Sequence, residues 1–174
     1  MTGLEELLQL SKQLSTLPDD PLYEDEFATA MLKVMAFLKR TDKMAPYYRY
    51  LQSLSKAQEK YQNYAEAANC VRDYAEHLPW SDPNKEKNLS SAVNFYEKAQ
   101  CYEEAIQIYK QLQNYYLEDN LNLVRIASHL FAESKFVDKI MASDRLKISH
   151  FRVAYYGAGF SSSIRGEHIY RGSA

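Results

Sequence analysis

Glycine and proline are missing from most of this chain, and their absence restricts its fold more than any motif does. No glycine occurs between Gly3 and Gly157, and no proline follows Pro83. These two residues are the usual interruptions of regular backbone structure. We therefore predict that residues 84 to 156 are mostly helical, and that the four glycines of the last 18 residues mark a different kind of structure.

Apolar residues recur at every third or fourth position of the first half, as they do on one side of an α-helix. A short first helix is predicted from the leucines at 4, 7, 8 and 14, ending at the turn "LPDDP". A second helix runs to about Arg40, with an apolar row at Phe27, Met31, Val34 and Leu38. A third helix is predicted to start near Pro46.

The same spacing continues to residue 143. A further helix is predicted to end near Leu78, because Pro79 and Pro83 bracket a turn there. A helix of about five turns is predicted from Leu123 onward. Its regularly spaced positions are Ala127, Leu130, Ser134, Val137 and Met141.

An internal repeat supports an array of helix pairs. The segment "YQNYAEAANCVRDY" matches "AQCYEEAIQIYKQL" 38 positions later, with Gln62, Tyr64 and Ala67 falling on Gln100, Tyr102 and Ala105. A small alanine lets two helices approach closely, so each copy is predicted to open the second helix of a pair. The pattern resembles the second helix of a tetratricopeptide repeat, although that family's usual period is about 34 residues.

Composition excludes several classes of function. The chain has 174 residues, a net charge of −2 and no apolar run long enough to span a bilayer, so we expect an intracellular, cytoplasmic protein without membrane insertion. Lysine and arginine do not cluster as nucleic-acid binding requires. Cys70 and Cys101 are predicted to be small, buried apolar residues. We expect neither a metal nor a cofactor, and we identify no catalytic residue.

The histidines form no catalytic pattern. They are scattered at positions 77, 129, 150 and 168, without zinc-helix or nucleophile-elbow spacing, and we predict that each lies at the surface or at a helix end. The fifteen tyrosines are more informative. They suit either packing between helix layers, which we favour, or burial against another protein, and some are predicted to do both.

The glycine-rich end "YYGAGFSSSIRG" raises the possibility of a phosphate-binding loop. A dinucleotide fingerprint needs a third glycine at position 162, which is serine, and only 12 residues follow it. The simpler interpretation is a turn in which Gly157 and Gly159 supply unusual backbone angles. The segments "FRVAYY" and "EHIYR" then form the two strands of a hairpin-like unit.

Several separated motifs follow one another along the chain, including the Trp80-Ser81-Asp82 turn, the pair Arg145-Leu146, the strand at 151–153 and the closing "IYRG". In this order they resemble the first half of the catalytic region of the DOCK family of exchange factors for Rho-type GTPases. The resemblance covers about two thirds of the chain. After the glycine turn the chain departs from the family pattern, because serines at 161–163 replace a proline and an apolar residue of that pattern.

This resemblance implies a helical lobe that often forms a homodimer and a sheet-rich lobe that contacts the GTPase switch region. It also implies a third lobe that expels GDP and magnesium. The chain stops before that lobe, so we expect it to be inactive alone and not an enzyme by itself. The candidate GTPase-contact residues are Arg152, Tyr155, Tyr156, Phe160, Ile164 and Arg165.

The predicted fold is therefore mainly α, an antiparallel tetratricopeptide-like array with a small C-terminal β hairpin-like segment. We predict a helical repeat-like lobe at 4–143 and a short β segment at 149–172. The leading hypothesis is the scaffold and dimerisation part of an exchange region for Rac-class, Rho-family GTPases. The alternative is a free-standing adaptor that binds a partner peptide in its helical groove.

Overall fold

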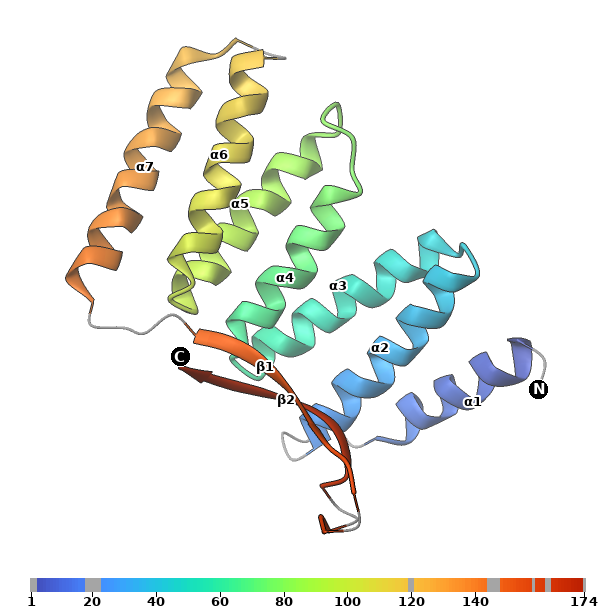
Figure 1. Cartoon of the computed structure of the whole chain (residues 1–174). Coiled ribbons are helices and arrows are strands. Elements are labelled where there is room, and N and C mark those ends of the chain that lie inside the picture. The colour runs from blue at the N-terminus through green and yellow to red at the C-terminus, as the bar shows by residue number, and fades with distance from the viewer. Residues whose placement is uncertain are drawn as a thin grey trace. The chain divides into compact units, whose positions relative to one another are not determined.

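The structure is a computed structural model of the chain, and it describes residues 3–17, 23–118, 121–143, 148–157, 159–161 and 164–173. These residues form seven α-helices and one two-stranded antiparallel sheet (Figure 1). The mainly helical fold with a C-terminal hairpin is confirmed. The helices and strands are α1 (Gly3–Thr16), α2 (Glu24–Arg40), α3 (Met44–Lys60), α4 (Tyr64–Glu76), α5 (Pro83–Lys98), α6 (Tyr102–Glu118), α7 (Leu123–Ala142), β1 (Ile148–Tyr155) and β2 (Gly166–Ser173).

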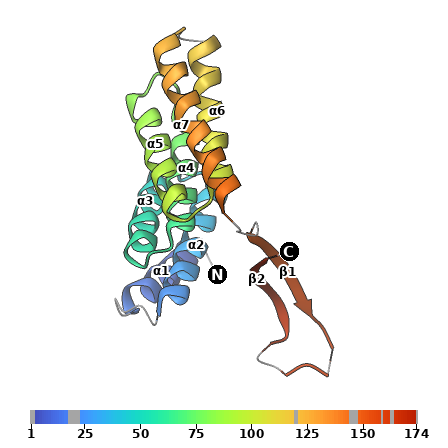
Figure 2. The same cartoon turned by 90° about the vertical axis from the view of Figure 1, so that its left-hand side faces the viewer.

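The chain divides into two compact units, Met1–Val137 and Asp138–Ala174. In the first unit consecutive helices run antiparallel, and each of α1 to α5 packs against the next (Figure 1). Figure 2 shows α3 and α5 toward one side of this array, with α4 and α6 toward the other. The domain limits 4–143 and 149–172 stay a prediction. The "LPDDP" turn and Arg145-Leu146 lie outside the described residues.

Three tight turns reverse the helices without any glycine. Asp42, Gln62 and Gln100 each adopt a positive φ, of 54°, 64° and 58°. Around Gln62, the amide of Asn63 donates to Gln58 O at 2.8 Å and the amide of Gln62 donates to Glu59 O at 3.0 Å. The turns at Asp42 and Gln100 repeat this pair of bonds, which is the Schellman arrangement that satisfies the last helical carbonyls.

The two predicted repeat copies begin at Tyr61 and Ala99, and their second residues, Gln62 and Gln100, lie at equivalent turns. Each turn places a tyrosine at the start of the next helix, Tyr64 in α4 and Tyr102 in α6. Residues 84 to 156 are mostly helical, as predicted, and Gln100, a non-glycine residue in the left-handed region, makes the turn between α5 and α6. The helix starts predicted near Tyr64 and Tyr102 are confirmed.

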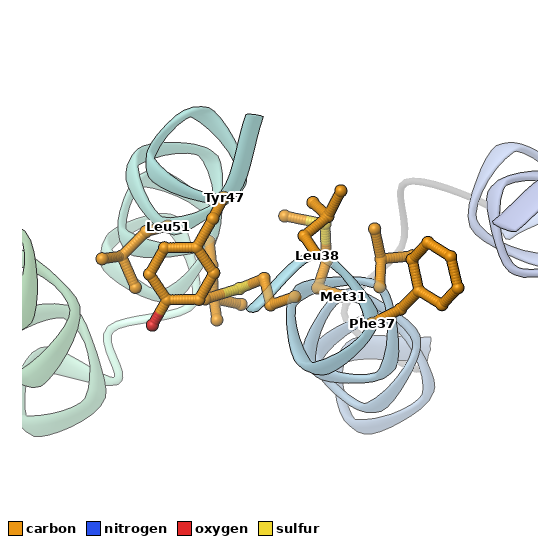
Figure 3. Packing of buried hydrophobic residues seen from close by; sticks show 8 residues of the cluster. Met31, Phe37, Leu38, Tyr47 and Leu51 are labelled. Atoms are coloured by element: carbon orange, nitrogen blue, oxygen red, sulfur yellow. The ribbon is translucent and has the colours of Figure 1, made fainter. Parts of the chain in front are cut away.

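Small and large apolar side chains alternate through the helical core. Ala67, Ala75, Ala92 and Ala105 are fully buried and allow close approach of the helices that carry them. A larger cluster surrounds α2, with Tyr47 and Leu51 of α3 on one side of this helix and Phe37 pointing to its other side, away from α3 (Figure 3). Its members are the buried side chains of Met31, Val34, Met35, Phe37, Leu38, Tyr47, Leu51 and Leu54.

Three buried tyrosines, Tyr47, Tyr96 and Tyr116, connect helices through their hydroxyl groups. The hydroxyl of Tyr47 donates to Asp73 at 2.7 Å, and that of Tyr96 donates to Asn69 at 2.6 Å. Burial and the bond to Asp73 raise the pKa of Tyr47 far above its ordinary value. Each ring contributes apolar area to the core while its oxygen remains hydrogen-bonded, which explains part of the tyrosine excess.

The turn between α4 and α5 surrounds a buried lysine. Lys85 Nζ donates to Ala75 O at 3.0 Å and to Leu78 O at 2.8 Å, and it lies 4.7 Å from the centre of the Trp80 ring. The Trp80 ring stacks on Tyr115 of α6 with 4.2 Å between ring centres. A cation at the C-terminal end of a helix complements its dipole, so this lysine stabilises the end of α4. The predicted proline-bracketed turn is confirmed, with Asp82 as the helix cap.

The left-handed turns make a stability test possible. Replacing Gln62 by glycine relieves the backbone strain of a positive φ, so we expect the free energy of unfolding to rise by about 0.5 to 1 kcal/mol. The matched control is Gln52→Gly, at an exposed position inside α3, which should lower it by about 1 kcal/mol. Urea unfolding followed by circular dichroism measures both. A loss of stability in Gln62→Gly contradicts the expectation.

Candidate functional site

All six residues predicted to contact a GTPase lie in strand β1 of the hairpin or in the loop between its two strands. Its strands pair from Tyr155 with Gly166 to Ile148 with Ser173. Gly157 and Gly166 have φ values of 116° and 122°, a backbone region that side chains with a Cβ rarely adopt. Of the two glycines predicted to supply unusual backbone angles, Gly157 does so, and the second such angle is at Gly166. The predicted turn joins two strands, and the strand predicted from "FRVAYY" is confirmed over residues 151–155.

One side of the hairpin collects aromatic rings. The register places Phe151 opposite Tyr170 and Val153 opposite His168, on the same side as Tyr155. The ring of Tyr155 lies 5.3 Å from that of Phe160 and 5.9 Å from that of His168, between ring centres. We define this aromatic face as Phe151, Tyr155, Phe160, His168 and Tyr170. Three of its rings, those of Phe151, Phe160 and Tyr170, are 42%, 40% and 43% exposed.

The opposite side of the hairpin is polar around one carboxylate. Arg152 Nε donates to Glu167 Oε2 at 2.8 Å, and the Tyr156 hydroxyl donates to Glu167 Oε1 at 3.1 Å. Both partners of this ion pair are exposed, so it adds little to stability. Ile169, on the same side, is one of the most exposed apolar residues of the described chain.

The structure separates the predicted contact residues instead of gathering them. Tyr155 and Phe160 belong to the aromatic face, whereas Arg152 and Tyr156 surround Glu167 on the other side. In the connecting loop Ile164 is exposed, and Arg165 donates from Nε to Phe160 O at 2.8 Å. Sequence reasoning left out Phe151, His168 and Tyr170 as contact residues. The alternation of the two strands was the signal that could have included them.

Helix α7 packs on α6 through rings. Phe136 lies 5.7 Å from Tyr102 and 5.9 Å from Tyr109, between ring centres. His129 lies 5.6 Å from Tyr109 and 5.7 Å from Tyr116. Phe136 and His129 are the buried residues of this helix. A hydrogen bond from Gln113 Nε2 of α6 to Glu133 Oε2 of α7, 2.8 Å long, also crosses this interface.

The surface position predicted for His129 was wrong. Its side chain is 8% exposed, and its Nδ1 atom is buried without a hydrogen bond to any described residue. Burial lowers the pKa of His129; the carboxylate of Glu86 works against this shift and the charge of Arg125 adds to it. Glu86 of α5 also accepts from Arg125 at 3.0 Å and from the Tyr116 hydroxyl at 2.5 Å. The neutral imidazole therefore suits this aromatic site.

The other side of α7 is apolar and exposed. Val124, Leu130, Phe131 and Val137 are 80%, 52%, 65% and 41% exposed, and Met141 in the last turn is 79% exposed. Of the positions whose spacing predicted the helix, Leu130, Val137 and Met141 thus point away from the core. We define the outer face of α7 as Val124, Ala127, Leu130, Phe131, Ser134 and Val137.

Metal and membrane sites are not seen in the described part of the chain. Within it, no three acidic, histidine or cysteine side chains gather as a metal ion would require. Nor does any described helix have the length and apolarity needed to cross a bilayer. Both cysteines are half-buried and not disulfide-bonded, and burial raises the pKa of the Cys70 thiol to about 12.

The fold is that of a helical array followed by a β-hairpin. Comparison with known proteins gives the family. No protein-family model matches the chain. The chain is 31% identical over 146 residues to human dedicator of cytokinesis protein 4, covering 72% of this chain and 7% of that protein. It is 28% identical over 160 residues to human dedicator of cytokinesis protein 3, covering 81% and 8%. The mouse form of the latter is 27% identical over 168 residues, covering 86% and 8%.

The chain belongs to the dedicator of cytokinesis family, abbreviated DOCK. The resemblance given by its separated motifs is thereby confirmed at the level of the family. The chain spans less than a tenth of the length of the curated relatives that it matches. The part of those proteins to which it corresponds stays a prediction.

The buried histidine gives a pH test of α7 packing. Because the folded state favours neutral His129, the unfolded chain binds more protons as the pH falls through the ordinary histidine range. Stability should therefore decrease from pH 7.5 to pH 5.5, and less so in His129→Gln, whose side chain does not titrate. Urea unfolding at both pH values measures the difference. An equal loss in the two proteins contradicts a lowered pKa for this histidine.

Proposed function

We propose that the chain is the scaffold and dimerisation part of a nucleotide-exchange region for Rho-family, Rac-class GTPases. Its membership of the DOCK family supports this, together with the order of a helical array followed by strands. The lobe that expels the nucleotide in that family is a further helical lobe. We therefore expect these residues alone to bind partners without accelerating nucleotide exchange. We expect the protein to act in the cytoplasm.

The observation that best supports dimerisation is the exposed, apolar outer face of α7. Nearly all soluble helices cover their apolar side, and this one exposes a second apolar side after packing the first on α6. Large exposed apolar patches mark interaction sites. The end of a helical array also needs a covering surface, because each helix pair is stabilised mainly by its neighbours.

The spacing of the outer face fits a second copy of itself. Its members lie symmetrically about the peptide bond between Leu130 and Phe131. A two-fold axis at that point pairs Val124 with Val137 and Ala127 with Ser134 of an antiparallel partner helix. A two-fold interface requires one patch to be complementary to itself, so this symmetry favours a homodimer over an unrelated occupant.

The size of this face predicts a weak dimer. Twenty residues of helix span about 30 Å, and a helix with its side chains is about 10 Å wide. One helix pair of those dimensions buries less than the roughly 1,200 Å² of a standard stable interface. We therefore expect association in the micromolar range unless further contacts join it.

The aromatic face of the hairpin is the proposed GTPase contact. Exposed aromatic rings are enriched at the energetically important centres of protein interfaces. A two-stranded hairpin is marginally stable alone, so a partner that covers this face also stabilises the strands. The serines at 161–163 supply little apolar area, which leaves Phe151, Phe160 and Tyr170 as the main contributors.

A charge on the outer face of α7 should abolish the dimer. At about 100 µM we expect sedimentation velocity to show dimer for the native chain and monomer for Leu130→Asp, since burying a carboxylate without a partner is costly. Leu32→Asp is the matched control, because Leu32 of α2 is 55% exposed and lies outside the outer face. A strictly monomeric native chain at this concentration, or equal disruption by the control, contradicts the proposal.

The aromatic face is tested by capture of a nucleotide-free Rac-class GTPase. Phe160→Ser and Phe151→Ser should each weaken binding at least about fivefold, because exposed rings contribute strongly to interfaces. Ile169→Ser is the control on the opposite side of the hairpin, 74% exposed. Fluorescent-GDP release by the same GTPase should remain at its spontaneous rate. Accelerated release contradicts inactivity, and unchanged capture by both phenylalanine variants contradicts the contact site.

A further inference from the structure

A groove lies between α3 and α5 of the first unit, and no residue of α7 or of the hairpin lines it. Its volume is about 400 Å³. Gln52 and Lys56 of α3 form one wall, Asn88 and Ser91 of α5 form the other, and Val71 of α4 lies between them. Figure 2 shows α3 and α5 toward the same side of the array, and the groove lies between these two helices.

The walls carry groups that suit a polypeptide backbone. Gln52 and Asn88 are carboxamides on opposite walls, and each side chain has both donors and an acceptor, as a peptide bond does. Asn88 Nδ2 donates to Asn84 O at 2.7 Å, and Ser91 Oγ donates to Lys87 O at 3.0 Å, so both side chains are held in place by α5. Fixed polar groups bind a ligand with a smaller loss of side-chain entropy.

The groove also has a small apolar part. Val71 and the half-buried Phe95 ring line it together. Lys98 Nζ lies 5.5 Å from the centre of the Phe95 ring and brings a positive charge beside this apolar contact. The combination fits one apolar side chain flanked by acidic ones.

Charge separates between the two sides of the array. Helices α3 and α5 together carry six basic side chains, of which Lys85 is buried, and three acidic ones, whereas α4 and α6 together carry two basic and six acidic side chains. Two charged residues line the groove itself, Lys56 and Glu59. Arg49 and Lys87 are exposed on the same two helices as the walls. This distribution attracts an acidic ligand to the α3 and α5 side.

We propose that the groove between α3 and α5 binds an extended acidic segment of another protein. The proposal goes beyond dimerisation and GTPase contact, because it uses neither the outer face of α7 nor the hairpin. The backbone of the segment pairs with Gln52 and Asn88, an acidic side chain meets Lys56, and an apolar one covers Val71 and Phe95.

The test uses a defined peptide on the whole chain. A fluorescein-labelled peptide of three Glu-Glu-Leu-Ser units is titrated with the chain, and anisotropy reports binding. The matched probe has Lys-Lys-Leu-Ser units. We expect saturable binding of the acidic peptide only, weakened about tenfold or more between low and high salt. No saturable binding of the acidic peptide at low salt, or equal binding of both peptides, overturns the proposal.

Variants separate the groove from general charge attraction. Lys56→Glu and Asn88→Asp each add negative charge to a different wall, and each should weaken the acidic peptide about tenfold. Lys110→Glu makes the same change as the first at an exposed position of α6 and should leave binding within about twofold. Circular dichroism confirms folding of each variant. Equal weakening by Lys110→Glu, or no weakening by the two groove variants, overturns the proposal.

Discussion

Helix reversal without glycine is the constraint from which this array is built. At Asp42, Gln62 and Gln100 a residue with a side chain accepts the left-handed conformation, at a cost of about 1 kcal/mol or more each. In return, two backbone bonds close each helix end and the next helix starts two residues later. Short turns of one geometry keep neighbouring helices antiparallel and close, and this closeness allows fully buried alanines such as Ala67 and Ala105 to fill the interfaces.

The helix interfaces use two kinds of packing. Between α4 and α5 small residues bring backbones together, and Lys85 joins the end of one helix to the start of the other through two carbonyl oxygens. Between α6 and α7 the space is filled by tyrosine, phenylalanine and histidine rings. The fifteen tyrosines therefore serve packing between layers in several places and, on the hairpin, an exposed surface.

Much of the fold was predictable because it depends on local periodicity. The spacing of apolar residues by three and four positions located the helices, and the repeat that matches Gln62 with Gln100 located the equivalent starts of α4 and α6. Which side of α7 faces the core was not predictable, because the helix is apolar on both sides and its buried positions are His129 and Phe136. The burial of Lys85 was likewise hidden, since its partners are backbone oxygens. The hairpin residues were located correctly, but their division between two sides requires the strand register.

The way in which α7 is held on α6 has a consequence for motion. Two side chains of α7, His129 and Phe136, are buried, and both contact aromatic rings of α6, whereas α5 buries five residues. Elements with fewer close contacts open first in sub-global fluctuations. The amide protons of α7 are thus expected to exchange with deuterium before those of the central helices, and any protein that covers α7 would slow that exchange.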